Sequence, residues 1–418
     1  MQANEVSHRP PVLRRTGFSP PVRLQRADAR WGRPERAKSR AAFARLTPSV
    51  LVLVLFFLLR LTGVAPASEP SAAPGDTLFL ANAPLRHLRL FIPDEGMERL
   101  RREPRQDFPA RLEDGTGVWL DVGVHLKGGG GSWRNLDDRP SLTLSFNRFV
   151  PRQQYCGQTK LHLNNSVQDP SFCRELICAE MFRAGGIPAA RVTHAEVSLN
   201  GRPLGLYVLK EGFTKTFLAS HFRRTDGNLY DIGPGQEVNE RMHRQLGHGP
   251  DEQADLRALA TAALETNAVL RWAGLTNTLD VSRFVSFLAL EVMLGHWDGY
   301  GMSGNNFRVY HDMDTDRLIF LPHGMDQALK QPLRTLRPEL NALVARGVLS
   351  TPSGSALYRV RFGTLFTNVF VLPRLSERLD EISAKLRRTH PEIEPNLVAL
   401  RAQLVSRAEC IRSKLASP

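Results

Sequence analysis

The hydrophobic pattern of this 418-residue chain changes character near Glu211. Before that point, from about Thr77, most apolar residues fall in short runs that alternate or are continuously apolar, as β-strands require. After it, apolar residues recur at helical spacing, and the segment 280–295 is apolar almost throughout, which is typical of a buried helix. This order predicts an α+β fold with two lobes, a β-rich one at 77–211 and a helix-rich one at 212–418.

Local signals predict individual elements within this plan. In the first part, short strands are expected at 88–92, 118–126, 141–146 and 160–163. One helix interrupts them, with Asp169 as its N-cap and Gly185-Gly186 at its end. A hairpin follows over 192–209, with its turn at Asn200-Gly201. The second part contains helices at 251–273 and 280–295, a hairpin of 307–310 with 318–321, and a helical tail at 338–416.

The basic excess of the chain is concentrated at its start. Residues 1–48 contain eleven Arg or Lys and three Asp or Glu, so they carry +8 of the formal net charge of +13. The remainder carries only +5, and it shows no arginine-rich stripe with interleaved aromatic residues. Nucleic-acid binding is therefore not expected.

A ten-residue apolar run at 50–59 follows this basic stretch and precedes Ala65-Pro66-Ala67. Basic, then apolar, then small residues is the order of a secretory signal. The run is shorter than the roughly 20 residues that span a membrane comfortably. Two alternatives remain for residues 1–67, a signal peptide that is cleaved and a signal anchor that is not cleaved. Either one places the body outside the cytoplasm, joined by a Pro/Ala/Ser-rich linker at 68–76.

Four cysteines outside the cytoplasm have the opportunity to pair. Cys173 and Cys178 are expected on one helix, pointing about 140° apart, so they should not bond to each other. One alternative pairs Cys156 with one of them and Cys410 with the other. Buried free thiols are the other alternative.

A glycine run follows the strand candidate at 118–126, in the segment Lys127-Gly-Gly-Gly-Gly-Ser-Trp133. Consecutive glycines let backbone N–H groups approach phosphates closely. A flexible hairpin loop is the structural alternative. The residues expected to contact phosphate are Lys127, Gly128, Gly129, Gly130, Gly131 and Ser132.

Glu175 is an acidic residue on an otherwise apolar face of the predicted helix. At about 100° per residue it falls within the arc of Phe172, Leu176, Ala179 and Phe182. A carboxylate on such a face needs a cationic partner. Either a lysine of the same lobe pairs with it and positions phosphates, or a nearby arginine forms a structural ion pair. The candidates are Lys127, Lys160, Arg174 and Arg183.

Three polar segments surround the second hairpin, at 296–300, 304–306 and 323–326. Antiparallel pairing about a turn near Asp314 places Asn306 opposite about Pro322. Carboxylates and amides therefore gather at one end of the hairpin, and such oxygen donors suit Mg²⁺ or Mn²⁺. Turn capping is the alternative role for these side chains. The four residues are Asp298, Asn305, Asn306 and Asp326.

These segments are similar to those of the CotH family, kinase-like proteins named after a spore coat protein. The matching stretches are HLKGGGGSW, RPSLTLSFNRF, KLHLNNSVQDPSFCREL, GLYVLKEGF, GNLYD, HWDGYGMSGNNFRVYHD and LPHGMDQAL. They follow one another over residues 118–329, roughly half of the chain. The resemblance implies an atypical protein-kinase-like fold that binds ATP and a divalent metal, Mg²⁺ or Mn²⁺, between a β-rich N-lobe and a helix-rich C-lobe.

The resemblance also implies roles for individual residues. Asp298 corresponds to the catalytic-loop aspartate, Asn306 with Asn305 to the metal-binding asparagine, and Asp326 to the metal-binding aspartate. Lys127 and Glu175 take catalytic positions. The nucleotide-binding residues that it implies are the glycines and serine after Lys127, together with Lys160, Tyr207, Leu209 and Glu211, the last three forming a hinge that meets adenine.

One departure from the family is visible in the sequence. Many members carry Trp-Asp-x-Asp after the hairpin, whereas this chain has His323-Gly324-Met325-Asp326, so one of the two acids is absent.

The function expected from the resemblance is transfer of phosphate from ATP to Ser or Thr residues of an envelope or coat protein. The alternative is a kinase-fold module of the cell envelope that binds partners with little or no turnover. A metal-dependent hydrolase using the same carboxylates is a third reading. Contact with a membrane is expected only through residues 50–59.

Overall fold

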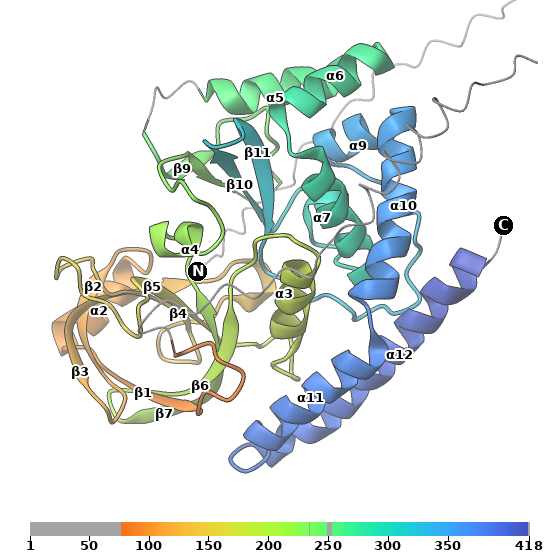
Figure 1. The fold of residues 1–418 in the computed structure, drawn as a ribbon. Helices are drawn as coiled ribbons and strands as arrows, with labels where there is room; N and C mark the ends of the chain where they lie inside the picture. The colour runs from red at the N-terminus through yellow and green to blue at the C-terminus, as the bar shows by residue number, and fades with distance from the viewer. Residues whose placement is uncertain (1–76, 234, 249–252, 417–418) are drawn as a thin grey trace, which may run out of the picture. The chain divides into compact units, whose positions relative to one another are not determined.

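The computed structural model describes residues 77–233, 235–248 and 253–416. The predicted export signal and the linker at 68–76 lie outside these residues. The described chain combines a closed β-barrel, a smaller sheet and a large set of helices (Figure 1). It is therefore a mixed α and β fold, as the hydrophobic pattern predicted.

The first part of the chain forms a seven-stranded closed barrel with the strand order β1-β2-β3-β4-β5-β7-β6. Neighbouring strands are antiparallel except β1 and β6, which are parallel and close the barrel. Alternate residues such as Leu142, Leu161 and Leu209 fill the interior. The strands are β1 (Arg86–Phe91), β2 (Phe108–Glu113), β3 (Val118–Lys127), β4 (Ser141–Ser145), β5 (Lys160–Asn164), β6 (Val192–Leu199) and β7 (Arg202–Glu211).

The four strands and the hairpin predicted before Glu211 are confirmed within a few residues at each end. Closure into a barrel was not predicted, because it depends on pairing between strands that are distant in sequence. Strand β2 was missed, as was the helix α2 (Asp94–Arg102). The glycine segment contains a short 3₁₀ turn, η1 (Gly130–Ser132).

The helix α3 (Arg174–Ala184) leaves the barrel and packs into the core of the second part, where Leu176, Ile177 and Phe182 are buried among residues of later helices. It begins five residues after Asp169, later than predicted. The Asp169 carboxylate nevertheless accepts a hydrogen bond from the Arg174 amide at 2.9 Å, so it still caps the first turn. Figure 1 shows α3 between the barrel and the helices.

The second part is built around a four-stranded sheet with the order β11-β10-β8-β9. The hairpin β10–β11 is confirmed, with Phe307 opposite Pro322. The buried helix predicted over 280–295 is α7. It begins after Asp280, whose carboxylate caps it, and ends before Gly295, which has the left-handed conformation. The strands are β8 (Leu229–Asp231), β9 (His243–Leu246), β10 (Phe307–Asp312) and β11 (Arg317–Pro322).

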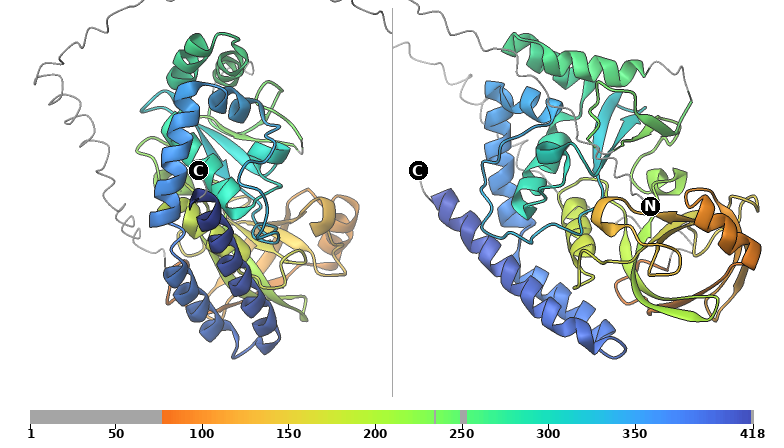
Figure 2. Two further views of the ribbon diagram at one scale, coloured as in Figure 1. Left: turned by 90° about the vertical axis from the view of Figure 1, so that its right-hand side faces the viewer. Right: turned by 180° about the vertical axis from the view of Figure 1, so that it is seen from behind.

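Helices cover this sheet and form the C-terminal part of the chain (Figure 2). The helix predicted over 251–273 is two helices, because Asn267 accepts hydrogen bonds from the amides of Val269 and Leu270 and so starts a new one. The helices are α4 (Lys215–Ala219), α5 (Ala254–Leu264), α6 (Ala268–Thr278), α7 (Val281–Leu294), α8 (Tyr300–Ser303), α9 (Leu343–Leu349), α10 (Pro352–Asn368), α11 (Leu372–Leu386), η2 (Pro391–Ile393) and α12 (Glu394–Ala416).

All four cysteines are thiols in this structure. Cys173 and Cys178 are fully buried in the core of the second part, so the free-thiol alternative is the one that the structure contains. Among the described helices, none has the length and apolar character that a membrane span requires.

Candidate functional site

The turn between α7 and α8 presents Asp298. Glu291, in the last turn of α7, accepts hydrogen bonds from the amides of Tyr300 at 2.7 Å and Gly301 at 2.8 Å. These are the first amides of α8, which have no partner inside the helix. Because Glu291 is fully buried, burial raises its pKa to about 8 despite these two bonds. The Glu291 carboxyl group thus links the end of α7 to the start of α8.

Two consecutive asparagines hold the Asp298 carboxylate. The Asn305 amide donates to one oxygen at 3.0 Å, and the Asn306 amide donates to the other at 2.8 Å and to the Asp298 carbonyl at 2.7 Å. All three side chains remain partly exposed. The structure therefore brings together three of the four oxygen-bearing residues predicted from the sequence.

The two asparagines differ in what their amide oxygens do. The Asn305 oxygen accepts a hydrogen bond from the Gly235 amide at 2.7 Å, in the loop between β8 and β9. The Asn306 oxygen instead points at Gly324, where an added Cβ would lie 2.3 Å from it. Asn306 thus presents its amide oxygen to the segment 323–326, whereas the Asn305 oxygen is engaged elsewhere.

Gly324 occupies the position where many CotH proteins have an acid. Its φ is +56°, a conformation that favours glycine, and the Asn306 side chain fills the space that a Cβ would need. The local backbone and the Asn306 side chain therefore favour glycine over an acid at this position. The predicted register is off by one residue, because the Asn306 carbonyl accepts from the His323 amide rather than facing Pro322.

Glu175 pairs with Lys210, a partner that the sequence analysis did not propose. The Lys210 ammonium donates to the Glu175 carboxylate, and both side chains are at most 2% exposed. Burial alone would raise the pKa of Glu175. The Lys210 charge, with hydrogen bonds from Lys210 and the Met325 amide, outweighs burial and lowers it. The ion-pair partner is therefore Lys210 rather than Lys127, Lys160, Arg174 or Arg183, and the Lys127 charge adds to the lowering of the Glu175 pKa.

Lys127 lies beside this ion pair and donates to the Asn164 side chain at the end of β5. Burial and the Lys210 charge lower the pKa of Lys127 to about 8, against the opposing effects of Glu175 and Asp326. Burial, together with the carboxylates of Glu175 and Asp169, raises the pKa of Asp326 to about 6. Two lysines and two carboxylates thus share one poorly solvated region.

The glycine segment after Lys127 is a defined turn. Gly128 and Gly130 have positive φ, and the Ser132 hydroxyl donates to the Gly129 carbonyl at 2.8 Å. Gly129, Gly130 and Gly131 are exposed. Gly131 packs so closely on Gln168 that a Cβ would lie 2.7 Å from the amide nitrogen. A compact, exposed turn of small residues beside a half-buried lysine suits the approach of a phosphate group.

The expected hinge at Tyr207, Leu209 and Glu211 is wrong. These residues lie in β7, which is hydrogen-bonded to β5 on one side and to β6 on the other. Tyr207 and Leu209 point into the barrel, and Glu211 pairs with Arg191. The segment has neither a free backbone edge nor an exposed side chain with which to meet adenine.

Lys160 lies at the opposite end of β5 from Asn164, packed against Gly212. Burial lowers its pKa, and the charge of Asp107 is the strongest effect that opposes this lowering. Lys160 therefore faces the same side of the barrel as Lys210 without joining the Glu175 pair.

Other polar residues of the site were missed from the sequence. The Lys210 ammonium lies 3.1 Å from Nδ1 of His323, and His296, two residues before Asp298, is fully buried. Arg308 is nearly buried, bonds Asp231 at 2.8 Å and stacks on the Phe213 ring at 4.8 Å. Period-two alternation puts Lys160, His162 and Asn164 of β5, together with Lys210 of β7, on the face opposite the barrel core, and this was the available signal for Lys210.

The donor set fits a divalent cation that is held jointly with phosphate oxygens. In the described ranges, no group of three or more His, Cys, Asp or Glu side chains is arranged to hold a metal. Mg²⁺ commonly uses one or two protein carboxylates and takes its remaining ligands from water and substrate phosphates. Asp326 and the Asn306 oxygen are the residues that would hold it.

Comparison with known proteins finds sequence similarity to a spore coat protein and to two invasins. The chain is 21% identical over 263 residues to the inner spore coat protein H of Bacillus subtilis, covering 59% of this chain and 69% of that protein. It is 24% identical to the invasin CotH2 and 25% identical to the invasin CotH3 of Rhizopus delemar, covering 39% and 46% of this chain. The chain spans about a third of the length of these two invasins, 31% and 35%.

Solved structures show weaker similarity. The toxin–antitoxin complex of HipA, HipB and operator DNA from Shewanella oneidensis matches with a TM-score of 0.34 and 14% identity, covering 85% of this chain and 82% of that one. The Helicobacter pylori proinflammatory kinase CtkA matches with a TM-score of 0.29 and 9% identity, covering 67% and 94%. Both scores are low, so family membership rests on sequence.

The sequence match is extensive. The model of the family described as CotH kinase protein matches residues 124–401, which is more than half of the chain. This range contains the glycine turn, the Lys210–Glu175 pair and the Asp298 turn. The chain belongs to the CotH family.

Proposed function

We propose that this protein is a phosphotransferase with a kinase-like two-lobed layout, which transfers the terminal phosphate of ATP to Ser or Thr residues of an envelope or coat protein. The observation that carries the proposal is a chain of contacts from Asp298 to the lysines. Asn306 donates to Asp298 and accepts from the His323 amide, and His323 lies 3.1 Å from the Lys210 ammonium. The charges of Lys210, Glu175 and Asp326 in turn act on Lys127. Such a combination meets the needs of phosphoryl transfer, which depends on positioning and charge stabilisation.

Each side chain has a distinct role in this proposal. Lys127, beside the glycine turn, binds phosphate oxygens. Lys210, fixed by Glu175, adds positive charge next to Lys127. Asp298, fixed by the two asparagines, orients the acceptor hydroxyl and takes its proton. Mg²⁺ or Mn²⁺, when bound, neutralises phosphate charge.

The relatives support an exported location. One is named as a spore coat protein and two as invasins, and the predicted signal at 1–67 agrees with these names. We propose that the protein acts outside the cytoplasm, anchored by residues 50–59 if the signal is not cleaved. Sequencing the N-terminus of the exported protein tests this, because cleavage gives a start near Ser68.

A binding module with little turnover is the second candidate function. The observation that favours it is Gly324, which leaves the segment after β11 with one acid instead of two. A thermal-shift titration of the full chain with Mg-ATP and Mn-ATP, followed by an assay for transfer of labelled phosphate, separates the two. Binding with transfer supports the phosphotransferase, and binding without transfer supports the module.

The two asparagines are predicted to affect metal binding differently. Asn306→Gly removes the amide oxygen presented to the segment 323–326 and is expected to weaken Mn²⁺ binding in the presence of ATP by about tenfold or more. Glycine suits this position because φ of Asn306 is +53°. The matched variant Asn305→Gly should change Mn²⁺ binding much less, because its oxygen is engaged by Gly235. Mn²⁺ electron paramagnetic resonance measures both, and equal losses would contradict the assignment.

Nucleotide affinity is predicted to fall as the pH rises past about 8. The pKa of Lys127 is lowered to about 8, so the charged form that binds phosphate decreases about tenfold between about pH 7 and pH 9. Calorimetric titration with Mg-ATP across this range measures the effect. Lys127→Met should bind weakly and lose this pH dependence, whereas the exposed Lys215→Met should behave like the wild type. A flat wild-type profile would remove Lys127 from the site.

A further inference from the structure

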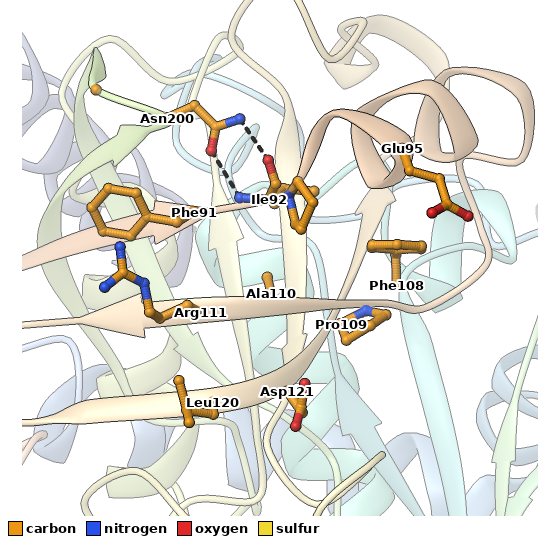
Figure 3. A pocket seen from close by; sticks show the side chains of 12 residues that line it. Phe91, Ile92, Glu95, Phe108, Pro109, Ala110, Arg111, Leu120, Asp121 and Asn200 are labelled. Carbon is orange, nitrogen blue, oxygen red and sulfur yellow. Dashed lines mark hydrogen bonds between the residues drawn. The ribbon is translucent and has the colours of Figure 1, made fainter.

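A cavity of about 810 Å³ opens on the barrel surface, lined by none of the residues assigned above. It lies across β1, β2 and β3, between the start of α2 and the β6–β7 turn, as Figure 3 shows. Its apolar lining includes Phe91, Phe108, Pro109 and Leu120. A concave apolar surface of this size accommodates several side chains of a bound partner.

Exposed apolar residues extend this lining. Leu120 is 56% exposed and Val118, two residues earlier on the same face of β3, is 57% exposed. Neither belongs to the core of the barrel. Contiguous exposed apolar residues on a soluble protein mark a contact surface more often than isolated ones do.

An irregularity in β3 turns two consecutive residues toward solvent at the cavity. Asp121 has φ of +52°, and the register between β2 and β3 shifts between Ala110 and Leu112. Leu120 and Asp121 are both exposed, whereas regular alternation would bury one of them. Bulges of this kind re-aim side chains at the edges of barrels and beside binding sites.

The charge at the cavity is acidic. Arg111 also lines the cavity; it stacks on the Phe91 ring at 4.2 Å and pairs at 2.7 Å with Glu113, which Arg89 also contacts at 3.2 Å. Glu95 and Asp121 line the cavity and form no ion pair with any other described residue. Two carboxylates therefore face one guanidinium group in the lining. Figure 3 shows Phe108 and Pro109 between these two carboxylates. The complement of this surface is an apolar side chain flanked by cations.

Strand addition is not available to a partner here. The Asn200 side chain accepts from the Ile92 amide and donates to the Ile92 carbonyl, each at 2.8 Å, and so closes the end of β1. The barrel itself is closed. A partner must therefore bind through its side chains rather than by extending a sheet.

We propose that this cavity docks an extended segment of a partner protein in which Lys or Arg residues flank Leu or Phe. The role of that partner as the phosphate acceptor rests on the proposed function, whereas the docking itself does not. The groove recruits the partner by charge and apolar contact away from the Asp298 turn.

Fluorescence anisotropy of the full chain with three sets of labelled ten-residue peptides, without nucleotide, tests the proposal. The first set has Leu or Phe flanked by Lys and Arg, the second has Glu in place of the basic residues, and the third has Ser in place of the apolar one. The first set should bind about tenfold more tightly than the others. The variant Glu95→Gln/Asp121→Asn should lose about tenfold in affinity for the first set, and asparagine tolerates the left-handed conformation at position 121. The exposed Glu409→Gln serves as the matched control.

Other outcomes overturn the proposal. These are equal binding of the basic and acidic sets, binding by none of them, or full affinity in the double variant. Self-association in sedimentation that Leu120→Ser abolishes would assign the groove to a second copy. Binding to anionic phospholipid vesicles that the same variant abolishes would assign it to a membrane. If the full chain binds the first peptide set but does not bind Mg-ATP, the proposed function is refuted and the docking proposal stands.

Discussion

Replacing Asp298 by asparagine is expected to slow phosphoryl transfer by about 10²- to 10⁴-fold, the usual contribution of a general base. Asparagine keeps the size of the side chain but cannot take a proton from the acceptor hydroxyl. Because Asp298 is held by Asn305 and Asn306 rather than by the lysines, nucleotide affinity should change little. Transfer of labelled phosphate from ATP, to the protein itself or to an acceptor, measures the rate.

The control for this variant is Asp314→Asn, which changes an acid in the turn of the same hairpin. Asp314 pairs with Arg223 at the opposite end of β10 from Asn306. The Asp314→Asn variant should transfer phosphate at the wild-type rate. Equal rates for wild type and Asp298→Asn would show that Asp298 has no role in the chemistry.

Replacing Glu175 by alanine is expected to destabilise the protein by about 3–5 kcal/mol, because it leaves the Lys210 ammonium buried without its partner. Both side chains are at most 2% exposed. The double variant Glu175→Gln/Lys210→Met removes both charges and should be less destabilised than Glu175→Ala. Chemical denaturation followed by circular dichroism measures the free energies.

The pH dependence of this pair follows from the pKa of Glu175, which is lowered in the folded protein. Its contribution is present above the pKa of the unfolded chain and is lost as the pH falls through the folded value. Wild type and double variant should therefore converge in acid. If Glu175→Ala were as stable as the wild type at neutral pH, the pair would contribute nothing to the fold.

Much of the fold was predictable because its signals are local. Asp280 before α7, Gly295 after it and Asn200-Gly201 between β6 and β7 act within a few residues of the elements that they delimit. Barrel closure was not predictable, because the parallel pairing of β1 with β6 joins segments about a hundred residues apart. The helix break at Asn267 was missed because helical spacing continues across it.

The candidate site likewise contains residues that local patterns predicted and residues that depend on contacts between distant segments. Asp298 and its asparagines lie within nine residues of one another. The hairpin pattern therefore predicted that they are close, and the structure has them in hydrogen-bond contact. Lys210 and Glu175 are 35 residues apart on different elements, and several lysines satisfied the same requirement for a cation. The hinge assignment failed because β7 has neighbours on both sides, which periodicity along a single strand does not reveal.

The central claim is that the lysines, Asp298 with its asparagines, and Asp326 form one site for a metal-bound triphosphate. Calorimetric titration of the full chain with Mn-ATP, in wild type, Asp326→Asn and Lys127→Met, tests it most directly. We predict saturable binding by the wild type and at least about tenfold weaker binding by each variant. Binding of equal strength in all three proteins, or no binding by the wild type, would contradict the claim.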